Sequence, residues 1–254
     1  VQDGVPLLAV FSAAHTAGGA QPVGSTVRYE QQYEDFERAQ KYNLKYERQF
    51  LKRLSTKREH QLLRRLLGRQ AHCARILEIP CGGGRISPQL AGVTDLLIQA
   101  DIGLGQVRYG KTRPRLPIPQ VWMTASAFHI PLRDAGVDAV VCIRLAHHLG
   151  TAQEREDLVV ELLRVARRYV IMTFFDDDSL KNNLRRLRGK KPKRTMKVSR
   201  VAQLAANGGA ELAVCPRLAF VGSGHRYALM VKTSSRGIST PTALSPHRQD
   251  PRAD

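Results

Sequence analysis

A glycine-rich turn after a short apolar segment is the pattern in this chain best suited to chemistry on a nucleotide. The segment Ile76–Arg85 reads ILEIPCGGGR, in which apolar residues run into Pro80 and three glycines. Glycines let the backbone approach a ligand closely because no Cβ stands in the way. A helix starting just after the turn would present free N–H groups to an anion. An ordinary tight turn between strand and helix has the same composition, so a second signal is needed.

Asp101 supplies that second signal, because it closes the next apolar segment in the sequence QADIG. An acidic residue about 20 positions after such a glycine turn is placed to bind the hydroxyls of a ribose. A helix N-cap or a solvated loop position is the alternative for an isolated aspartate. Together with the glycine turn, we favour the ribose role and expect the two places to converge on one nucleoside.

Two adjacent histidines, His147 and His148, lie just past another apolar segment, Val137–Ile143. A histidine that titrates near neutral pH can take a proton from an attacking hydroxyl. A structural role is equally open for either residue, as a cap on the next helix or as packing on the sheet. If one of them is catalytic, His147 is our choice.

The elements that must position these residues alternate between strand and helix patterns. An amphipathic helix is expected over Glu154–Ala166, and a shorter one, capped by Ser199, ends at Gly208. This alternation predicts a parallel sheet with helices on both faces. The predicted strands are Arg75–Ile79, Asp95–Ala100, Val121–Thr124, Val137–Ile143, Tyr169–Phe175, Glu211–Val214 and Tyr227–Lys232.

The segments on either side of this alternation have a different composition. Residues 28–68 show helical spacing and predict two helices, with a break near Ser55 and Gly68 as the C-cap. The aromatic residues of this segment either cover the site as a lid or pack in the core. They are Tyr33, Phe36, Tyr42 and Tyr46. We expect residues 1–27 to be a disordered tail or a remnant of something upstream, and residues 234–254 to be a disordered tail. Residues 69–233 are then the main domain.

Over roughly residues 62–232 these motifs resemble the class I S-adenosylmethionine-dependent methyltransferases, particularly the small-molecule group that includes ubiquinone and menaquinone methyltransferases. The resemblance implies a Rossmann-like, seven-stranded, mostly parallel sheet with an antiparallel C-terminal strand, and S-adenosylmethionine as cofactor. It implies that Gly82 and Gly84 pass close to the cofactor and that Glu78 holds its amino group. It also implies that Asp101 takes both ribose hydroxyls and that Ile102 packs on the adenine.

Two further motifs extend the resemblance. Ser126 and Ala127 precede a proline step, and Ser126 replaces the aspartate that usually receives the adenine amino group; a hydroxyl can accept that bond. Pro80 replaces the first glycine of the usual turn and fixes its φ. The sequence DAVVCIRLAHHL resembles the fourth family motif, which implies that Arg144 lies over the methionine end of the cofactor. Methyl transfer in such a site is direct and in line, so it rests on positioning and needs no metal.

The charge of the chain is unusual, with 40 Lys and Arg against 22 Asp and Glu, a formal net charge of +18. Such an excess attracts nucleic acid, an acidic membrane surface or an acidic substrate, or it simply solvates the surface. Residues 181–197 form a basic insertion where this fold often places substrate recognition. Without aromatic residues it does not support base stacking, but its cations can bind a phosphate; the candidates are Arg185, Arg186, Lys190 and Lys191.

These observations favour a methyltransferase that acts on a small-molecule or lipid-like acceptor, and the basic charge makes an anionic acceptor one candidate. An RNA methyltransferase is one alternative, and a non-catalytic cofactor-binding or scaffold protein is the other. The sequence IRLAHH stands where enzymes that methylate base amino groups carry Asp/Asn-Pro-Pro-aromatic, and Cys142 lies inside a strand rather than in the loop that cytosine C5 enzymes need. The four cysteines form no CxxC pair, which argues against zinc and suits a reducing cytoplasm.

Overall fold

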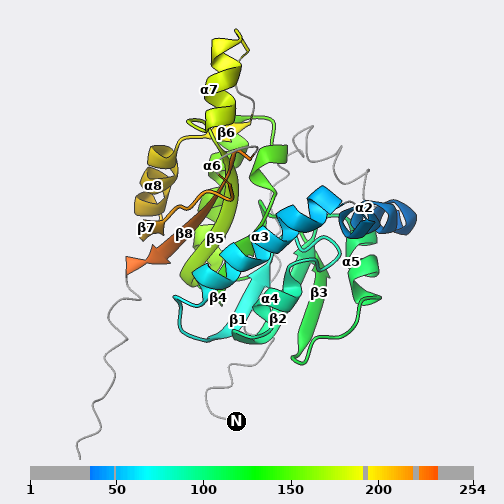
Figure 1. Ribbon diagram of the computed structural model, residues 1–254. Coiled ribbons are helices and arrows are strands. Elements are labelled where there is room, and N and C mark those ends of the chain that lie inside the picture. Colours follow the sequence, from blue (N-terminus) through cyan, green and yellow to red (C-terminus); the bar gives the residue numbers. More distant parts are fainter. Residues whose placement is uncertain (1–34, 49, 191–193, 220–222, 234–254) are drawn as a thin grey trace, which may run out of the picture.

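The computed structural model describes residues 35–48, 50–190, 194–219 and 223–233, and these form a mixed sheet with helices on both faces (Figure 1). In chain order, the strands are β1 (Cys73–Glu78), β2 (Thr94–Asp101), β3 (Gln120–Thr124), β4 (Val137–Cys142), β5 (Ala166–Asp176), β6 (Thr195–Met196), β7 (Ala210–Val214) and β8 (His225–Lys232). The helices are α2 (Phe36–Arg48), α3 (Phe50–Leu67), α4 (Ser87–Leu90), α5 (Leu104–Lys111), the 3-10 turn η2 (Ala146–His148), α6 (Ala152–Val165), α7 (Leu180–Leu187) and α8 (Val198–Asn207).

The strand order confirms the predicted fold. The sheet runs β3-β2-β1-β4-β5-β8-β7, and the two-residue strand β6 pairs with β5 outside this path. The neighbours in the part β3-β2-β1-β4-β5 all pair in parallel, whereas β8 is antiparallel to both β5 and β7. Since β1 is followed by β2 on one side and pairs with β4 on the other, the strand order reverses at β1. Ligands bind at the carboxyl ends of the strands beside such a reversal.

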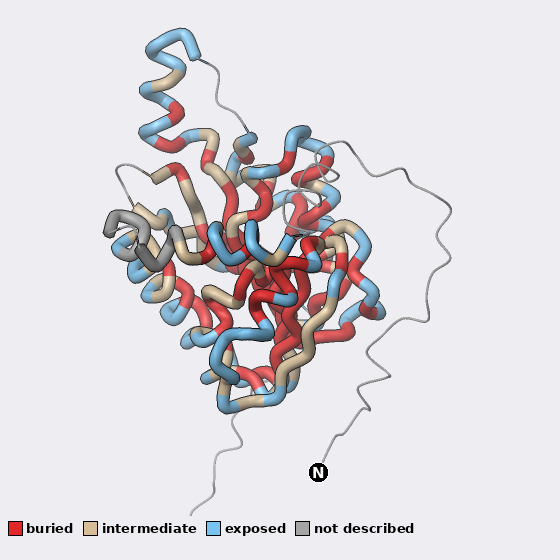
Figure 2. The backbone as a smooth tube through the Cα atoms, turned by 90° about the vertical axis from the view of Figure 1, so that its right-hand side faces the viewer, coloured by how far each residue is buried: buried red, intermediate tan, exposed pale blue. Residues whose placement is uncertain are grey.

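The two faces of the sheet are buried in separate apolar cores. Every residue of β4 is buried, as expected for a parallel strand covered on both sides. Ala139 and Val141 point into the core beneath α3 and α4, and Val140 and Cys142 point into the core beneath α6 and α8. Figure 2 shows these strands as the buried interior of the molecule. The sheet is therefore a rigid support for the loops at its edges.

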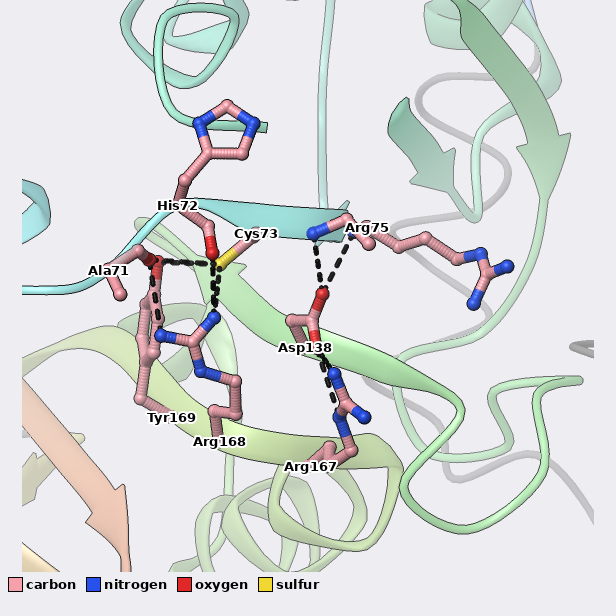
Figure 3. Close-up of polar contacts among 9 residues, drawn as sticks. Ala71, His72, Cys73, Arg75, Asp138, Arg167, Arg168 and Tyr169 are labelled. Atoms are coloured by element: carbon pink, nitrogen blue, oxygen red, sulfur yellow. Dashed lines mark hydrogen bonds and ion pairs between the residues drawn. The ribbon is translucent and has the colours of Figure 1, made fainter. Parts of the chain in front are cut away.

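A polar cluster holds the amino ends of three central strands together (Figure 3). Asp138, at the start of β4, accepts hydrogen bonds from the backbone N–H groups of Ala74, at 2.6 Å, and Arg75, at 3.1 Å. The guanidinium of Arg167 in β5 pairs with the same carboxylate. Asp138 thereby ties β1, β4 and β5 at the end of the sheet opposite the ligand edge, which sets where their carboxyl ends emerge.

Three predicted helix boundaries are wrong: the break near Ser55, the start of α8 and the start of α6. Ser55 lies inside α3 rather than at a break, and its hydroxyl accepts a 3.5 Å contact from Arg144. Helix α2 ends at Arg48 and α3 begins at Phe50. Helix α8 begins at Val198, with Lys197 as its N-cap. The preceding pairing of β6 with β5 fixes where the chain enters this helix, so Ser199 falls within its first turn.

Helix α6 begins earlier than predicted and carries a complete capping box. The Thr151 hydroxyl accepts from the Glu154 N–H at 3.1 Å, and the Glu154 carboxylate accepts from the Thr151 N–H at 2.8 Å. Such reciprocal bonds satisfy two of the free donors at a helix start. No helix among residues 35–48, 50–190, 194–219 and 223–233 is long and apolar enough to cross a membrane. The predicted tails, 1–27 and 234–254, and Tyr33 lie outside the described residues.

Candidate functional site

The glycine turn and Asp101 meet at the carboxyl ends of β1 and β2. Gly82 has a φ of +53°, a conformation that glycine adopts without cost, and its N–H donates to Asp101 Oδ2 at 2.8 Å. Asp101 Oδ1 accepts from the Gly103 N–H at 2.9 Å. Burial raises the pKa of Asp101 to about 6, although the bonds from Gly103 and Gly82 oppose that rise. The two places that the sequence predicted to converge are therefore in direct contact.

Two adjoining hollows open at this edge of the sheet. The apolar hollow has an empty volume of 510 Å³, and its lining includes Ile102, Ser126, Ala127, Phe128 and Leu149. The polar hollow has an empty volume of 560 Å³, and its lining includes Glu78, Gly82, Arg85, Asp101, Gln106 and Arg144. Pro80 and His148 line both. One hollow therefore suits a flat apolar ring and the other suits hydroxyl and charged groups.

All but one of the predicted cofactor residues line these hollows. Gly84 lines a third hollow instead, beside Ser87 and Trp122, and Gly83 takes its place in the polar hollow. Gly83 is also a position that leaves no room for a side chain. A Cβ there would lie 2.5 Å from the ring of Tyr109 and 2.8 Å from Asn43 Cγ. The backbone of the turn therefore packs closely against side chains of α5 and α2.

Glu78 is a fully buried carboxylate that lacks one partner. Its Oε2 accepts from the Ser87 hydroxyl at 2.6 Å, whereas Oε1 has no hydrogen-bond partner among the described residues. Burial raises the pKa of Glu78 to about 8, against the lowering effect of Ser87 and Arg85. A buried acceptor left without a bond costs free energy. An ammonium group in the polar hollow would supply the missing donor, so this position fits an amino acid moiety.

Arg144 is held in an uncommon backbone conformation at the end of β4. Its φ is +65°, and its N–H donates to the Thr173 hydroxyl at 2.6 Å. Non-glycine residues rarely adopt this region, and those that do cluster at functional sites. The Arg144 Nε donates to Glu59 Oε1 at 2.9 Å, so its guanidinium is fixed along the wall of the polar hollow.

Glu59, on α3, is the site residue that the sequence analysis missed. Its carboxylate is fully buried, pairs with Arg85 and Arg144, and accepts from the Tyr227 hydroxyl at 2.6 Å. Burial alone would raise the pKa of Glu59, but the charges of Arg85 and Arg144 outweigh it and lower the pKa to about 2. Both arginines of the polar hollow are therefore positioned by one carboxylate.

The two histidines face different surroundings. His147 packs among rings, with its centroid 4.7 Å from that of Phe175 and 5.0 Å from that of His225, and it lines neither hollow. Burial, with the neighbouring charges of His148 and His225, lowers the pKa of His147 to about 2. His148 instead lines both hollows, and burial followed by the charges of Arg194 and Arg144 lowers its pKa.

The N-terminal helices contribute to the site in two ways. Tyr42 and Asn43 of α2 line the polar hollow, and Asn43 Nδ2 donates to Gln106 Oε1 at 2.9 Å. Phe36 packs on Tyr109, with ring centroids 6.1 Å apart. The aromatic stripe therefore divides between wall and packing, and the side chain of Tyr46 is outside the described residues.

The predicted basic residues do not line the two hollows. Arg185 and Arg186 lie on α7 and Lys190 follows it, whereas Lys191 is outside the described residues. Arg186 pairs with Asp177 at 2.5 Å. These side chains stand on a helix that projects from the body of the molecule (Figure 1).

Comparisons with known proteins agree with this geometry. The family model described as a methyltransferase domain matches residues 77–173. Magnesium protoporphyrin IX methyltransferase from Synechocystis PCC 6803, solved with bound S-adenosylhomocysteine, is 16% identical with a TM-score of 0.66, covering 82% of this chain and 100% of that one. The N-methyltransferase NodS from Bradyrhizobium japonicum WM9, in complex with S-adenosylhomocysteine, is 12% identical with a TM-score of 0.59, covering 83% and 100%.

At these identities the likeness to solved structures establishes the fold. A search of curated proteins found no match. The glycine turn and Asp101 both lie within the residues that match the family model. Residues 77–173 therefore match a methyltransferase domain, and the chain has the Rossmann-like fold of the S-adenosylmethionine-dependent methyltransferases.

Proposed function

We propose that this protein transfers a methyl group from S-adenosylmethionine to a small or lipid-like acceptor that carries negative charge. The observation that carries the proposal is the meeting of Asp101 and Gly82, 2.8 Å apart, between an apolar and a polar hollow. A nucleoside joined to an amino acid needs this combination: a slot for a base, a carboxylate for a ribose and charged groups for the amino acid.

The lining residues divide naturally between the parts of the cofactor. Ile102, Ala127 and Phe128 supply an apolar slot for the adenine, and the Ser126 hydroxyl lies at its edge. Asp101 keeps acceptor capacity for ribose hydroxyls, because each carboxylate oxygen can accept more than one bond. Glu78 Oε1 would accept from the amino group, and Arg85 and Arg144 provide cations for the carboxylate. S-adenosylmethionine supplies an electrophilic methyl group on its sulfonium.

His148 is the proposed catalytic residue, in place of our initial choice, His147. It lines both hollows, so its ring borders the junction between them. Its lowered pKa keeps the imidazole neutral at neutral pH, and a neutral imidazole can accept a proton from a hydroxyl or amine that attacks the methyl group. His147 has a pKa of about 2, which makes it a weak base. We propose that His147 instead supports the ring of His148, 4.2 Å away between centroids.

The negative charge of the acceptor is inferred from the cations around this edge. Arg194 and Arg144 both act electrostatically on His148, so an anionic group beside that ring would be attracted. An RNA acceptor rests on the basic segment alone, and Arg186 of that segment already pairs with Asp177. We therefore favour a small or lipid-like anion over RNA.

Calorimetric titration with S-adenosylmethionine and S-adenosylhomocysteine tests the cofactor half of the proposal. Asp101→Asn should weaken both by roughly tenfold to a hundredfold, because a charged acceptor to the ribose is lost. Asp157→Asn, an exposed carboxylate on α6, is the matched control and should bind normally. A wild-type protein that binds neither compound would show that the site is not a cofactor site and would favour the non-catalytic scaffold alternative.

Release of S-adenosylhomocysteine in the presence of candidate acceptors tests the catalytic half. We expect turnover with anionic acceptors that present a hydroxyl or amine, and a fall in kcat of about a hundredfold or more for His148→Ala. Loss of rate should appear mainly in kcat, with the cofactor Kd changed little. Turnover on RNA but not on small or lipid acceptors would overturn the assignment of the acceptor class.

A further inference from the structure

Helix α7 carries an apolar stripe that faces solvent. Leu180, Leu184 and Leu187 are 52%, 43% and 84% exposed, and at about 100° per residue they fall on one side of the helix. A leucine exposed singly is ordinary, but three on one face form a patch, which marks a site of interaction. In Figure 1 this helix projects from the body of the molecule, and Figure 2 shows its end largely as exposed residues.

The opposite side of α7 is attached to the fold. Asn182 lies roughly opposite the leucines on the helical wheel, is buried, and its Nδ2 donates to the Asp176 carbonyl at 2.7 Å. The Ser179 hydroxyl caps the helix by accepting from the Asn182 N–H. Arg186 binds both the carbonyl and the carboxylate of Asp177. These contacts hold the helix with its leucines pointing away from the protein.

All charged residues within α7 and in the segment that follows it are cationic. Residues 179–210 contain no Asp or Glu, and exposed cations flank the leucines at Lys181, Arg188 and Lys190. A helix with Leu on one side and Lys or Arg beside it is the pattern of a segment that lies in the surface of an anionic membrane. Its leucines enter the boundary between headgroups and acyl chains, and its cations pair with phosphate.

We propose that α7 docks the protein onto anionic lipid bilayers, with Leu180, Leu184 and Leu187 inserted and the flanking cations on the headgroups. The leucines favour lipid over RNA, because a phosphate backbone gives them nothing apolar to bury against and the segment has no aromatic residue for stacking. The formal net charge of +18 adds long-range attraction to the same surface.

Membrane docking by α7 would determine where the protein is located, and this proposal does not depend on the identity of the acceptor. It nevertheless has a consequence for the site. Helix α7 follows directly after β5, and the Phe175 ring near the end of that strand lies 4.7 Å from His147 and 4.4 Å from His225, between centroids. The carboxyl edge of β5, beside the histidines, is therefore the part of the site joined most directly to the docked helix.

Sedimentation with sucrose-loaded vesicles tests the proposal on the full chain. One vesicle contains phosphatidylcholine alone, and the other contains phosphatidylcholine and phosphatidylglycerol in equal parts. Wild-type protein should sediment with the anionic vesicle only. Leu184→Ser combined with Leu187→Ser should lower the partition coefficient by about tenfold or more. Val160→Ser, which removes a 57% exposed side chain from α6, is the apolar control and should change nothing.

Charge reversal separates docking by α7 from attraction by net charge. Lys181→Glu with Arg188→Glu should abolish sedimentation, whereas Arg108→Glu with Lys111→Glu, an equal change of charge on exposed positions of α5, should retain most of it. Thermal melting of each variant identifies any that fails to fold, in which case single substitutions at the same positions replace it.

Three results would overturn the proposal. The first is a wild-type protein that does not sediment with anionic vesicles. The second is a leucine variant that sediments as well as wild type, since binding would then be electrostatic alone. The third is binding of RNA or an acidic polypeptide through Lys181 and Arg188 in the absence of vesicle binding, which would assign α7 to another partner.

Discussion

Replacing Glu59 by glutamine removes a buried charge that pairs with both arginines of the polar hollow. Its pKa falls from 4.5 to about 2, and the side chain is only 1% exposed, so solvent screens the interaction little. At 1.36 kcal/mol per pKa unit, the fall from 4.5 to about 2 corresponds to roughly 3 kcal/mol of folding stability. This agrees with the 3–5 kcal/mol or so that is typical of breaking a buried ion pair by removing one partner.

Thermal unfolding measures this loss directly. For a chain of this size, roughly 3 kcal/mol corresponds to a fall in Tm of about 6–12 °C at neutral pH. Glu37→Gln, at an exposed position on α2, is the matched control and should shift Tm by no more than a degree or so. Cofactor affinity should fall as well, because Arg85 and Arg144 would lose their common anchor.

The pH dependence of the difference makes the test specific. A carboxylate whose folded pKa is depressed stabilises the fold above its unfolded pKa and loses that contribution as the pH falls through the folded value. The gap between wild type and Glu59→Gln should therefore be constant above about pH 5, shrink below 4.5 and close near 2. A gap that persists undiminished at pH 3, or a neutral-pH gap below 1 °C or so, would refute the electrostatic account.

Two further changes probe the glycine turn and its neighbours. Burial holds the pKa of Glu78 at about 8, so its carboxyl group is protonated below that pH. Because an ammonium ligand requires the ionised carboxylate, the affinity for S-adenosylmethionine should rise with pH up to about 8. Calorimetry should show this slope between pH 6.5 and 8, above the range of Asp101, and Glu78→Gln should remove it. Gly83→Ala should cost about 1–3 kcal/mol in denaturant unfolding because the Tyr109 ring must shift. Gly92→Ala, where no atom lies within 4 Å, should be neutral, and equal effects at both positions would contradict the packing argument.

Most of the sheet could be predicted from the sequence because its signals are local. Strands β1, β2 and β5 are apolar runs that end at proline or acidic residues, and β4 is an apolar run that ends before Arg144. A parallel sheet buried on both faces requires such runs. The contact of Gly82 with Asp101 followed from the same logic, since adjacent parallel strands end at one edge.

The starts of helices were less predictable, because several residues can serve as an N-cap and tertiary contacts determine which of them does. Ser199 has the stronger intrinsic preference for an N-cap, but the pairing of β6 with β5 places Lys197 there. Glu59 was hidden for a similar reason. It is one acidic residue in a basic helix, and its partners Arg85, Arg144 and Tyr227 are 26, 85 and 168 positions away. No local pattern reports contacts at that separation.

The residues that complete the site come largely from outside the segment that matches the methyltransferase domain. Residues 77–173 supply the glycine turn and Asp101, which a cofactor of this kind would need, and they also supply His148. Glu59, Asn43 and Tyr42 come from α2 and α3, ahead of that segment, and Tyr227 comes from β8, after it. Since the arginines of the polar hollow are fixed by these outer elements, the shape and charge presented to an acceptor depend on parts of the chain in which the family match carries no information. The acceptor must therefore be sought by varying α2, α3 and β8, and not by comparing the nucleotide-binding core with its relatives.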